Sequence, residues 1–165
     1  MNINNRVSRG NGIIAQIMNI LDTVAFGPNY FKIALMLRKS LLISSVLTNC
    51  EVWFGLSDQD IKNLENIDIM FFRRLFRVPR TTPIVAYYLE TGSLTFSTII
   101  KLKRLKYLHY LANIPKTDML KKVFVQMWDN PGKKDWTEEV KMNMFEFKLE
   151  TEWKSLNGVS YKEYQ

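Results

Sequence analysis

Residues 57–80 read SDQDIKNLENIDIMFFRRLFRVPR, and this stretch predicts the fold class. Ser57 and Asp60 have the spacing of an N-terminal helix cap, in which each side chain bonds the backbone N–H of the other residue. Apolar residues then recur every three or four positions as far as Pro79, at Ile61, Leu64, Ile67, Phe71 and Leu75. That period is typical of a helix with one buried face. The stretch therefore predicts a long amphipathic helix that ends among arginines.

The same spacing recurs on both sides of this stretch. It predicts further helices at about 13–24, 30–49, 94–113, 117–128 and 135–156. Residues 30–49 are apolar on nearly every side, so we expect that helix to be the central one. Residues 81–89 favour a shorter helix, because Pro83 suits a first turn, with a strand at 84–89 as the alternative.

These segments together predict an all-α fold, an irregular multi-helix bundle of about six or seven helices. A chain of 165 residues is long enough for one domain or for two small helical lobes. The best candidate for a boundary is the stretch from Pro79 to Pro83, which divides the chain into lobes at 1–80 and 81–165. A single domain is the alternative.

The charge balance favours a polyanionic partner such as nucleic acid. Lys and Arg number 23 against 16 Asp and Glu, which gives a net charge of +7 and a pI near 9.5. Arg38 and Lys39 interrupt the most apolar run, residues 33–47, so we expect no membrane association through a spanning helix. Cys50 is the only cysteine, which indicates a reducing compartment, cytoplasmic or nuclear.

No residue pattern indicates a catalytic centre. His109 is the only histidine, and we expect it to pack between aromatic neighbours on its helix. The acidic pair Glu138 and Glu139 suits a helix N-terminus better than a two-metal site. Gly10-Asn11-Gly12 has no strand before it, so it does not resemble a phosphate-binding loop. We therefore expect no enzyme activity from this chain alone, and no cofactor or metal ion.

The candidate binding residues are two groups of cations. The first group ends the helix in the opening stretch and comprises Arg73, Arg74, Arg77 and Arg80. Guanidinium groups so placed can hold phosphates, although cations at this helix end also complement its negative dipole. The second group lies on the 94–113 helix and comprises Lys101, Lys103, Arg104 and Lys106, with Lys121, Lys122, Lys133 and Lys134 beyond it. The four tryptophans favour packing over stacking on bases.

A succession of short motifs runs along the chain. They are Leu37-Arg38-Lys39-Ser40-Leu41-Leu42, Glu51-Val52-Trp53, Leu64-Glu65 with Asp68, Arg73-Arg74-Leu75, Pro83, Tyr88-Leu89-Glu90-Thr91-Gly92, Arg104-Leu105, Tyr107-Leu108-His109, Gln126 before Pro131, and Asp135-Trp136. In this order they cover nearly the whole chain. The succession resembles the region after the palm in reverse transcriptases of non-LTR retrotransposons and in proteins derived from them.

This resemblance implies a helical thumb and connector, which hold a primer–template duplex by its backbone. It makes residues 1–80 a thumb-like lobe and residues 81–165 a basic connector lobe. The fingers and the palm, with its paired metal-binding aspartates, are not matched by these 165 residues, so polymerase activity is not implied. The function expected is non-specific binding of RNA or RNA–DNA duplex, with a palm domain acting in trans as a conceivable protein partner.

Two alternatives stay open. The chain can be a helical protein–protein interaction module, in which Phe71, Phe72 and Phe76 form an exposed apolar patch. It can also be a retrotransposon remnant without a selected function.

Overall fold

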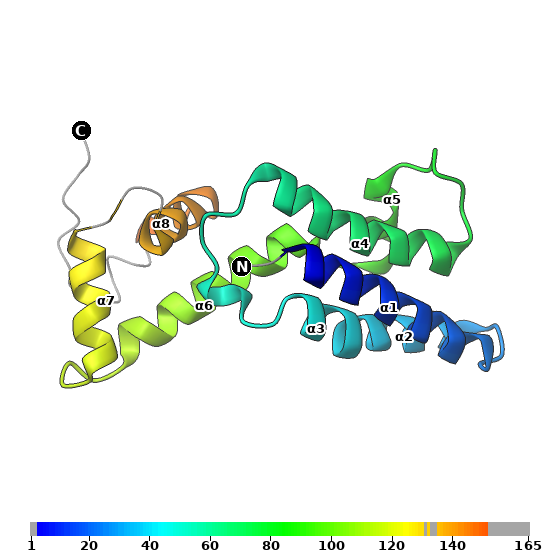
Figure 1. The fold of residues 1–165 in the computed structure, drawn as a ribbon, viewed down its shortest axis with the longest axis horizontal. Helices are drawn as coiled ribbons and strands as arrows, with labels where there is room; N and C mark the ends of the chain where they lie inside the picture. The colour runs from blue at the N-terminus through cyan, green and yellow to red at the C-terminus, as the bar shows by residue number, and fades with distance from the viewer. Residues whose placement is uncertain (1–2, 131, 133–134, 152–165) are drawn as a thin grey trace. The chain divides into compact units, whose positions relative to one another are not determined.

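The computed structural model describes residues 3–130, 132 and 135–151, and this part of the chain is built from helices without a strand (Figure 1). The all-α prediction is therefore confirmed. The chain divides into two compact units. Unit one comprises Met1–Asn49 and Leu56–Ile100, and unit two comprises Cys50–Gly55 and Lys101–Gln165. The predicted boundary near residue 80 falls inside unit one instead, because the helices on either side of it pack together.

Unit one is organised around its first helix. α1 (Ile3–Asp22) contacts α2 (Pro28–Leu37), α3 (Ser44–Val46) and α4 (Asp58–Phe76). In Figure 1, α1 and α4 run side by side in the same direction, and the segment from α2 to α3 returns along α1. The central position thus belongs to α1, and the expectation that residues 30–49 would hold it was wrong.

A glycine explains why α1 can take that position. A Cβ atom on Gly10 would lie 2.8 Å from Ile67 Cγ2 and 3.2 Å from Val46 Cγ2. The first distance is shorter than Cβ atoms tolerate and the second is tight, so a glycine at this position allows α4, and to a lesser degree α3, to approach α1 this closely. Gly10 is therefore a packing residue in the middle of a helix.

The segment after α2 is a π-helix, η1 (Arg38–Ile43), which continues into α3. Along the continuous segment from α2 through η1 to α3, four buried residues are spaced by four: Ala34, Arg38, Leu42 and Val46. In an α-helix a step of four residues rotates the side chain by about 40° beyond a full turn, so such a stripe would drift around the helix. The wider π-helical turn reduces this drift. It keeps the charged residue of the stripe, Arg38, pointing inward.

α4 begins and ends as its sequence predicts. The Ser57 hydroxyl accepts from Asp60 N–H at 3.1 Å, and the Asp60 carboxylate accepts from Ser57 N–H at 3.1 Å. Arg77, with a φ of 53°, ends the helix in the left-handed conformation. After the turn at 79–83, α5 (Ile84–Thr91) forms the predicted short helix, and it ends at Gly92 with a φ of 60°.

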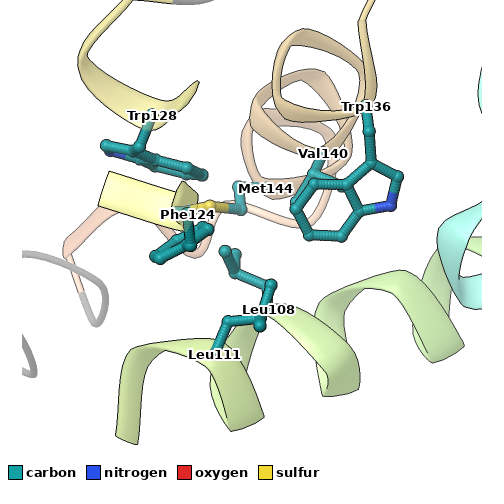
Figure 2. Close-up of a cluster of buried hydrophobic side chains, with 7 residues drawn as sticks. All are labelled: Leu108, Leu111, Phe124, Trp128, Trp136, Val140 and Met144. Carbon is teal, nitrogen blue, oxygen red and sulfur yellow. The ribbon is translucent and has the colours of Figure 1, made fainter. Parts of the chain in front are cut away.

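Unit two has its own apolar core. α6 (Phe96–Asn113) begins in unit one, and its later part packs with α7 (Met119–Asp129) and α8 (Trp136–Glu146). Figure 2 shows the side chains that meet in this core: Leu108 and Leu111 from α6, Phe124 and Trp128 from α7, and Trp136, Val140 and Met144 from α8. A short 3-10 helix, η2 (Cys50–Val52), belongs to the same unit.

The last predicted helix is shorter than its apolar pattern indicated. α8 ends at Glu146, and Lys148 then has a φ of 55°. The Leu149 N–H donates to Met144 O at 3.0 Å, which closes the helix end. Residues 152–156, predicted as part of this helix, lie outside the described residues.

Candidate nucleic-acid interface

The first predicted group of cations lies on one short stretch of backbone. Arg73 and Arg74 belong to the last turn of α4, Arg77 ends it, and Arg80 lies in the turn that follows. These residues therefore share one end of unit one.

Arg73 has a structural role within this group. Its half-buried side chain donates from Nη2 to Arg80 O at 3.1 Å, so it holds the turn against the last turn of α4. Its Nε is buried without a hydrogen-bond partner among the described residues. Arg73 therefore positions Arg80 and contributes little guanidinium surface of its own.

Arg74, Arg77 and Arg80 are exposed, and none of them forms an ion pair within the described part of the chain. The negative end of the α4 dipole attracts such cations and stabilises them by about 0.3–1 kcal/mol each. That attraction does not occupy the N–H donors of a guanidinium group. The three side chains can therefore stabilise the helix end and still bind an anion from solution.

The surrounding sequence contains almost no negative charge. Residues 69–89 include four arginines and no acidic residue. Residues 91–117 likewise lack an acid and carry Lys101, Lys103, Arg104, Lys106 and Lys116. Glu90 is thus the only acid between Asp68 and Asp118, so few acids close in sequence can neutralise these cations.

A buried ion pair fixes the helix that carries the arginines. Arg38 donates from Nε and Nη2 to the two carboxylate oxygens of Asp68 at 2.7 and 2.6 Å. The side chains are 5% and 0% exposed. Arg38 also donates to Leu94 O at 3.0 Å and lies 4.9 Å from the ring centroid of Phe72. This bidentate pair therefore joins η1 to α4 and to the segment before α6.

Two further side chains extend the pair into a network. The Tyr88 hydroxyl donates to Asp68 Oδ2 at 3.1 Å, and Glu65 Oε2 lies 3.4 Å from the same hydroxyl. Glu65 Oε1 accepts from Ser97 N–H at 2.8 Å. Burial raises the pKa of Asp68, and hydrogen bonds from Arg38 and Tyr88 oppose that rise. Burial and the two carboxylates raise the pKa of Tyr88, so its hydroxyl stays a donor.

This network was not among the predicted features, although the sequence contains a sign of it. Arg38 interrupts an apolar run, and Asp68 lies on the apolar stripe of α4. A charge on each of two otherwise buried faces indicates a buried pair, because an unpaired charge is too costly there.

The second predicted group of cations is not one surface. Lys101 lies 2.7 Å from Glu146 Oε1 and is neutralised by it. Lys103 is half-buried, and Lys106 is exposed. Of this group, Lys106 has the side chain most open to solvent.

Arg104 does not belong to the surface, and its prediction as a binding residue was wrong. Its side chain is buried, lies 2.8 Å from Glu139 Oε2 and donates to Trp53 O. Glu139 also accepts from Gly55 N–H at 2.6 Å, so the pair holds residues 50–55 within unit two. Burial lowers the pKa of Arg104, and Glu139 opposes this.

The physical reason is the orientation of α6. Its buried stripe comprises Phe96, Ile100, Arg104, Leu108 and Leu111. The apolar residues Phe96, Ile99, Leu102, Leu105 and Leu108 also recur at helical spacing, but Leu102 is exposed. A charged residue, Arg104, lies at the centre of the buried stripe, so apolar spacing alone does not identify that stripe.

The remaining lysines of the second group differ in role. Lys121 donates from Nζ to Leu111 O at 3.0 Å and Ala112 O at 2.6 Å, where it caps the end of α6. Burial, with Lys116 nearby, lowers the pKa of Lys121. Lys122 is exposed, whereas the predicted Lys133 and Lys134 lie outside the described residues.

Several other predicted positions have structural roles. Trp53, Trp128 and Trp136 are buried, which agrees with packing, and Trp153 lies outside the described residues. His109 is exposed and contacts Asn113, so the expectation that it packs between aromatic rings was wrong. Successive residues of an α-helix are rotated by about 100°, so His109 points away from the core that holds Leu108.

The predicted apolar patch for a protein partner is also absent. Phe71 and Phe72 are fully buried and Phe76 is half-buried, since they form the core face of α4. The exposed apolar side chains of the neighbouring α5 are Ile84, Val85 and Leu89.

Cys50 is the one thiol of the chain. Burial raises the pKa of the Cys50 thiol to about 11, which keeps it protonated. No group of three or more potential metal ligands occurs among the described residues. None of the described helices is both long and apolar enough to cross a membrane. Comparison of the chain with protein families, with curated proteins and with solved structures found no match.

Proposed function

We propose that unit one binds the sugar–phosphate backbone of RNA or RNA–DNA duplex, without sequence preference, through Arg74, Arg77 and Arg80. The observation that carries the proposal is three exposed guanidinium groups on one helix end, unpaired among the described residues, in a stretch without acids. Phosphate contacts of this kind position a protein on a duplex and carry no sequence information. The resemblance to a thumb region supports the same role.

The other predicted cations support this surface differently. Arg73 places Arg80 through its backbone oxygen. Lys103 and Lys106 belong to unit two and are proposed as contacts that unit two makes by itself with nucleic acid. Lys101 contributes only after it separates from Glu146.

The test is binding of an RNA–DNA duplex, measured by fluorescence anisotropy over a range of salt concentrations. The variant carries Arg74→Gln, Arg77→Asn and Arg80→Gln, because asparagine tolerates the left-handed backbone at position 77. The control carries Arg9→Gln, Lys39→Gln and Lys62→Gln. It removes the same charge from other exposed positions of unit one.

The arginine variant should bind more weakly, and by a similar factor for unrelated sequences. Each lost phosphate contact lowers the slope of log K against log salt by about 0.9, so three contacts lower it by roughly 2.7. The control variant should keep most of the slope. Equal losses in both variants would mean that net charge alone binds the duplex, and a folded wild type without affinity would refute the proposal.

A protein partner is the second candidate function, and the exposed face of α5 favours it. Val85 and Leu89 are 65% and 77% exposed and lie one turn apart. Light scattering over a range of concentrations would detect self-association, and Leu89→Lys should abolish it if this face is the interface.

A further inference from the structure

Aromatic rings connect the core of unit one to its surface at the end of α4. Phe72 is fully buried, and its ring centroid lies 6.2 Å from that of Phe76. Phe76 stacks on Phe31 at 5.6 Å, and Phe31 lies 5.7 Å from Phe26. Phe76 and Phe31 are half-buried, and Phe26 is 80% exposed. The series therefore ends in a ring at the surface.

The ring of Phe26 is largely exposed, and its two aromatic neighbours are tilted relative to it. Tyr30 lies 5.2 Å away at an interplanar angle of 46°, and the angle to Phe31 is 77°. Neither neighbour stacks parallel to Phe26. A flat partner from solution can therefore lie against a face of the ring, as nucleobases do on aromatic side chains.

The arginines lie at the same end. Phe76, the second ring from Phe26 along the series, directly precedes Arg77, and Arg80 is tied back to Arg73 in the last turn of α4. The charge matches a nucleotide too, because residues 23–50 contain no acid and neither do residues 69–89. An exposed aromatic ring and guanidinium groups without an ion pair among the described residues together suit an unpaired nucleotide, because the base can stack on the ring and the phosphates can bind the cations.

We propose that this end of unit one binds an unpaired nucleotide that extends from a duplex, with its base stacked on Phe26 and its phosphates near Arg77 and Arg80. The inference rests on the proposed function and deepens it, since it names the part of the nucleic acid that this surface selects. A purely apolar partner fits less well, because the exposed ring lies beside cations.

The experiment compares a blunt RNA–DNA duplex with the same duplex carrying a short single-stranded extension. The wild type should bind the extended duplex more tightly by roughly 5- to 150-fold, which is the range for stacking of one base on an aromatic side chain. Phe26→Ala should remove this preference and leave blunt-duplex binding unchanged. Phe26→Trp should preserve it. Phe145→Ala is the matched control, because Phe145 is 76% exposed and belongs to unit two.

A second ligand separates stacking from charge. An extension made of abasic nucleotides keeps the phosphates and lacks the bases. The affinity of the wild type for this abasic extension should therefore be no higher than the affinity of Phe26→Ala for the normal extension. Equal binding of blunt and extended duplexes by the wild type would overturn the inference while leaving backbone binding intact. A preference that survives in Phe26→Ala would also overturn it. If the wild type binds neither the blunt nor the extended duplex, the proposed function itself is refuted.

Discussion

Replacing Asp68 by asparagine should be among the most damaging single changes in unit one. The substitution keeps the shape of the side chain and removes its charge, which leaves the Arg38 guanidinium buried without a counterion. Breaking a buried pair in this way costs about 3–5 kcal/mol. A single domain is stable by about 5–15 kcal/mol, so the loss is a large share of the total. We expect Asp68→Asn to unfold unit one at much lower denaturant.

Urea unfolding followed by far-UV circular dichroism measures this loss. With a slope of about 2 kcal/mol per molar urea, a loss of 4 kcal/mol lowers the midpoint by about 2 M. Tryptophan fluorescence reports unit two, because Trp53, Trp128 and Trp136 lie there. Glu146→Gln is the comparison, since it breaks the exposed pair with Lys101, and such pairs contribute about 0–1 kcal/mol.

A double replacement tests the mechanism of the loss. Arg38→Met with Asp68→Leu removes both charges, so no uncompensated ion remains in the interior. The double variant should be more stable than Asp68→Asn. If Asp68→Asn costs no more than Glu146→Gln, the buried pair does not hold α4 in place, and the reasoning fails.

Three further predictions concern unit one. Gly12→Ala should raise the free energy of unfolding by about 0.5–1 kcal/mol, because a Cβ atom there meets no atom within 4 Å. Gly10→Ala should lower it by about 1–3 kcal/mol, because the added Cβ collides with Ile67. The urea midpoints of the two variants test both predictions. Arg77→Gly should stabilise the fold by about 0.5–1 kcal/mol, since glycine suits the left-handed backbone at this position, and should weaken duplex binding. An unchanged melting temperature and an unchanged duplex affinity would contradict both the conformational and the binding role of Arg77. Hydrogen bonds from the Ser57 hydroxyl and backbone N–H lower the pKa of Asp60. The stability that Asp60 contributes is therefore complete above the ordinary aspartate pKa of about 4 and is lost as pH falls through the lowered pKa. The melting temperature of Asp60→Asn should depend less on pH in that range than the melting temperature of the wild type.

The helical segments could be predicted because their causes are local. The reciprocal cap at Ser57 and Asp60, the left-handed end at Gly92 and the turn at 79–83 each depend on residues close in sequence. The arginine group at the end of α4 follows from the same local pattern. Three of these arginines form no ion pair among the described residues, which agrees with the lack of acids in residues 69–89.

The roles of individual charges could not be predicted so directly. Arg38 and Arg104 both interrupt apolar patterns, and each is buried because an acid from a distant segment meets it. Phe71 and Phe72 lie beside exposed arginines in sequence, yet they form the core. Which face of a helix is buried depends on its neighbours, and a charged residue on that face breaks the apolar period from which the face is inferred.

The helical class, several helix ends and the basic character of the α4 terminus could be predicted because capping, turn chemistry and composition act within a few residues. Three other properties come from the packing of distant segments: which cations remain without an ion pair among the described residues, where the chain divides into units, and the position of Phe26 at the end of a series of rings. Those properties depend on contacts between residues far apart in the chain, such as Arg38 with Asp68 and Phe31 with Phe76, which no local pattern specifies.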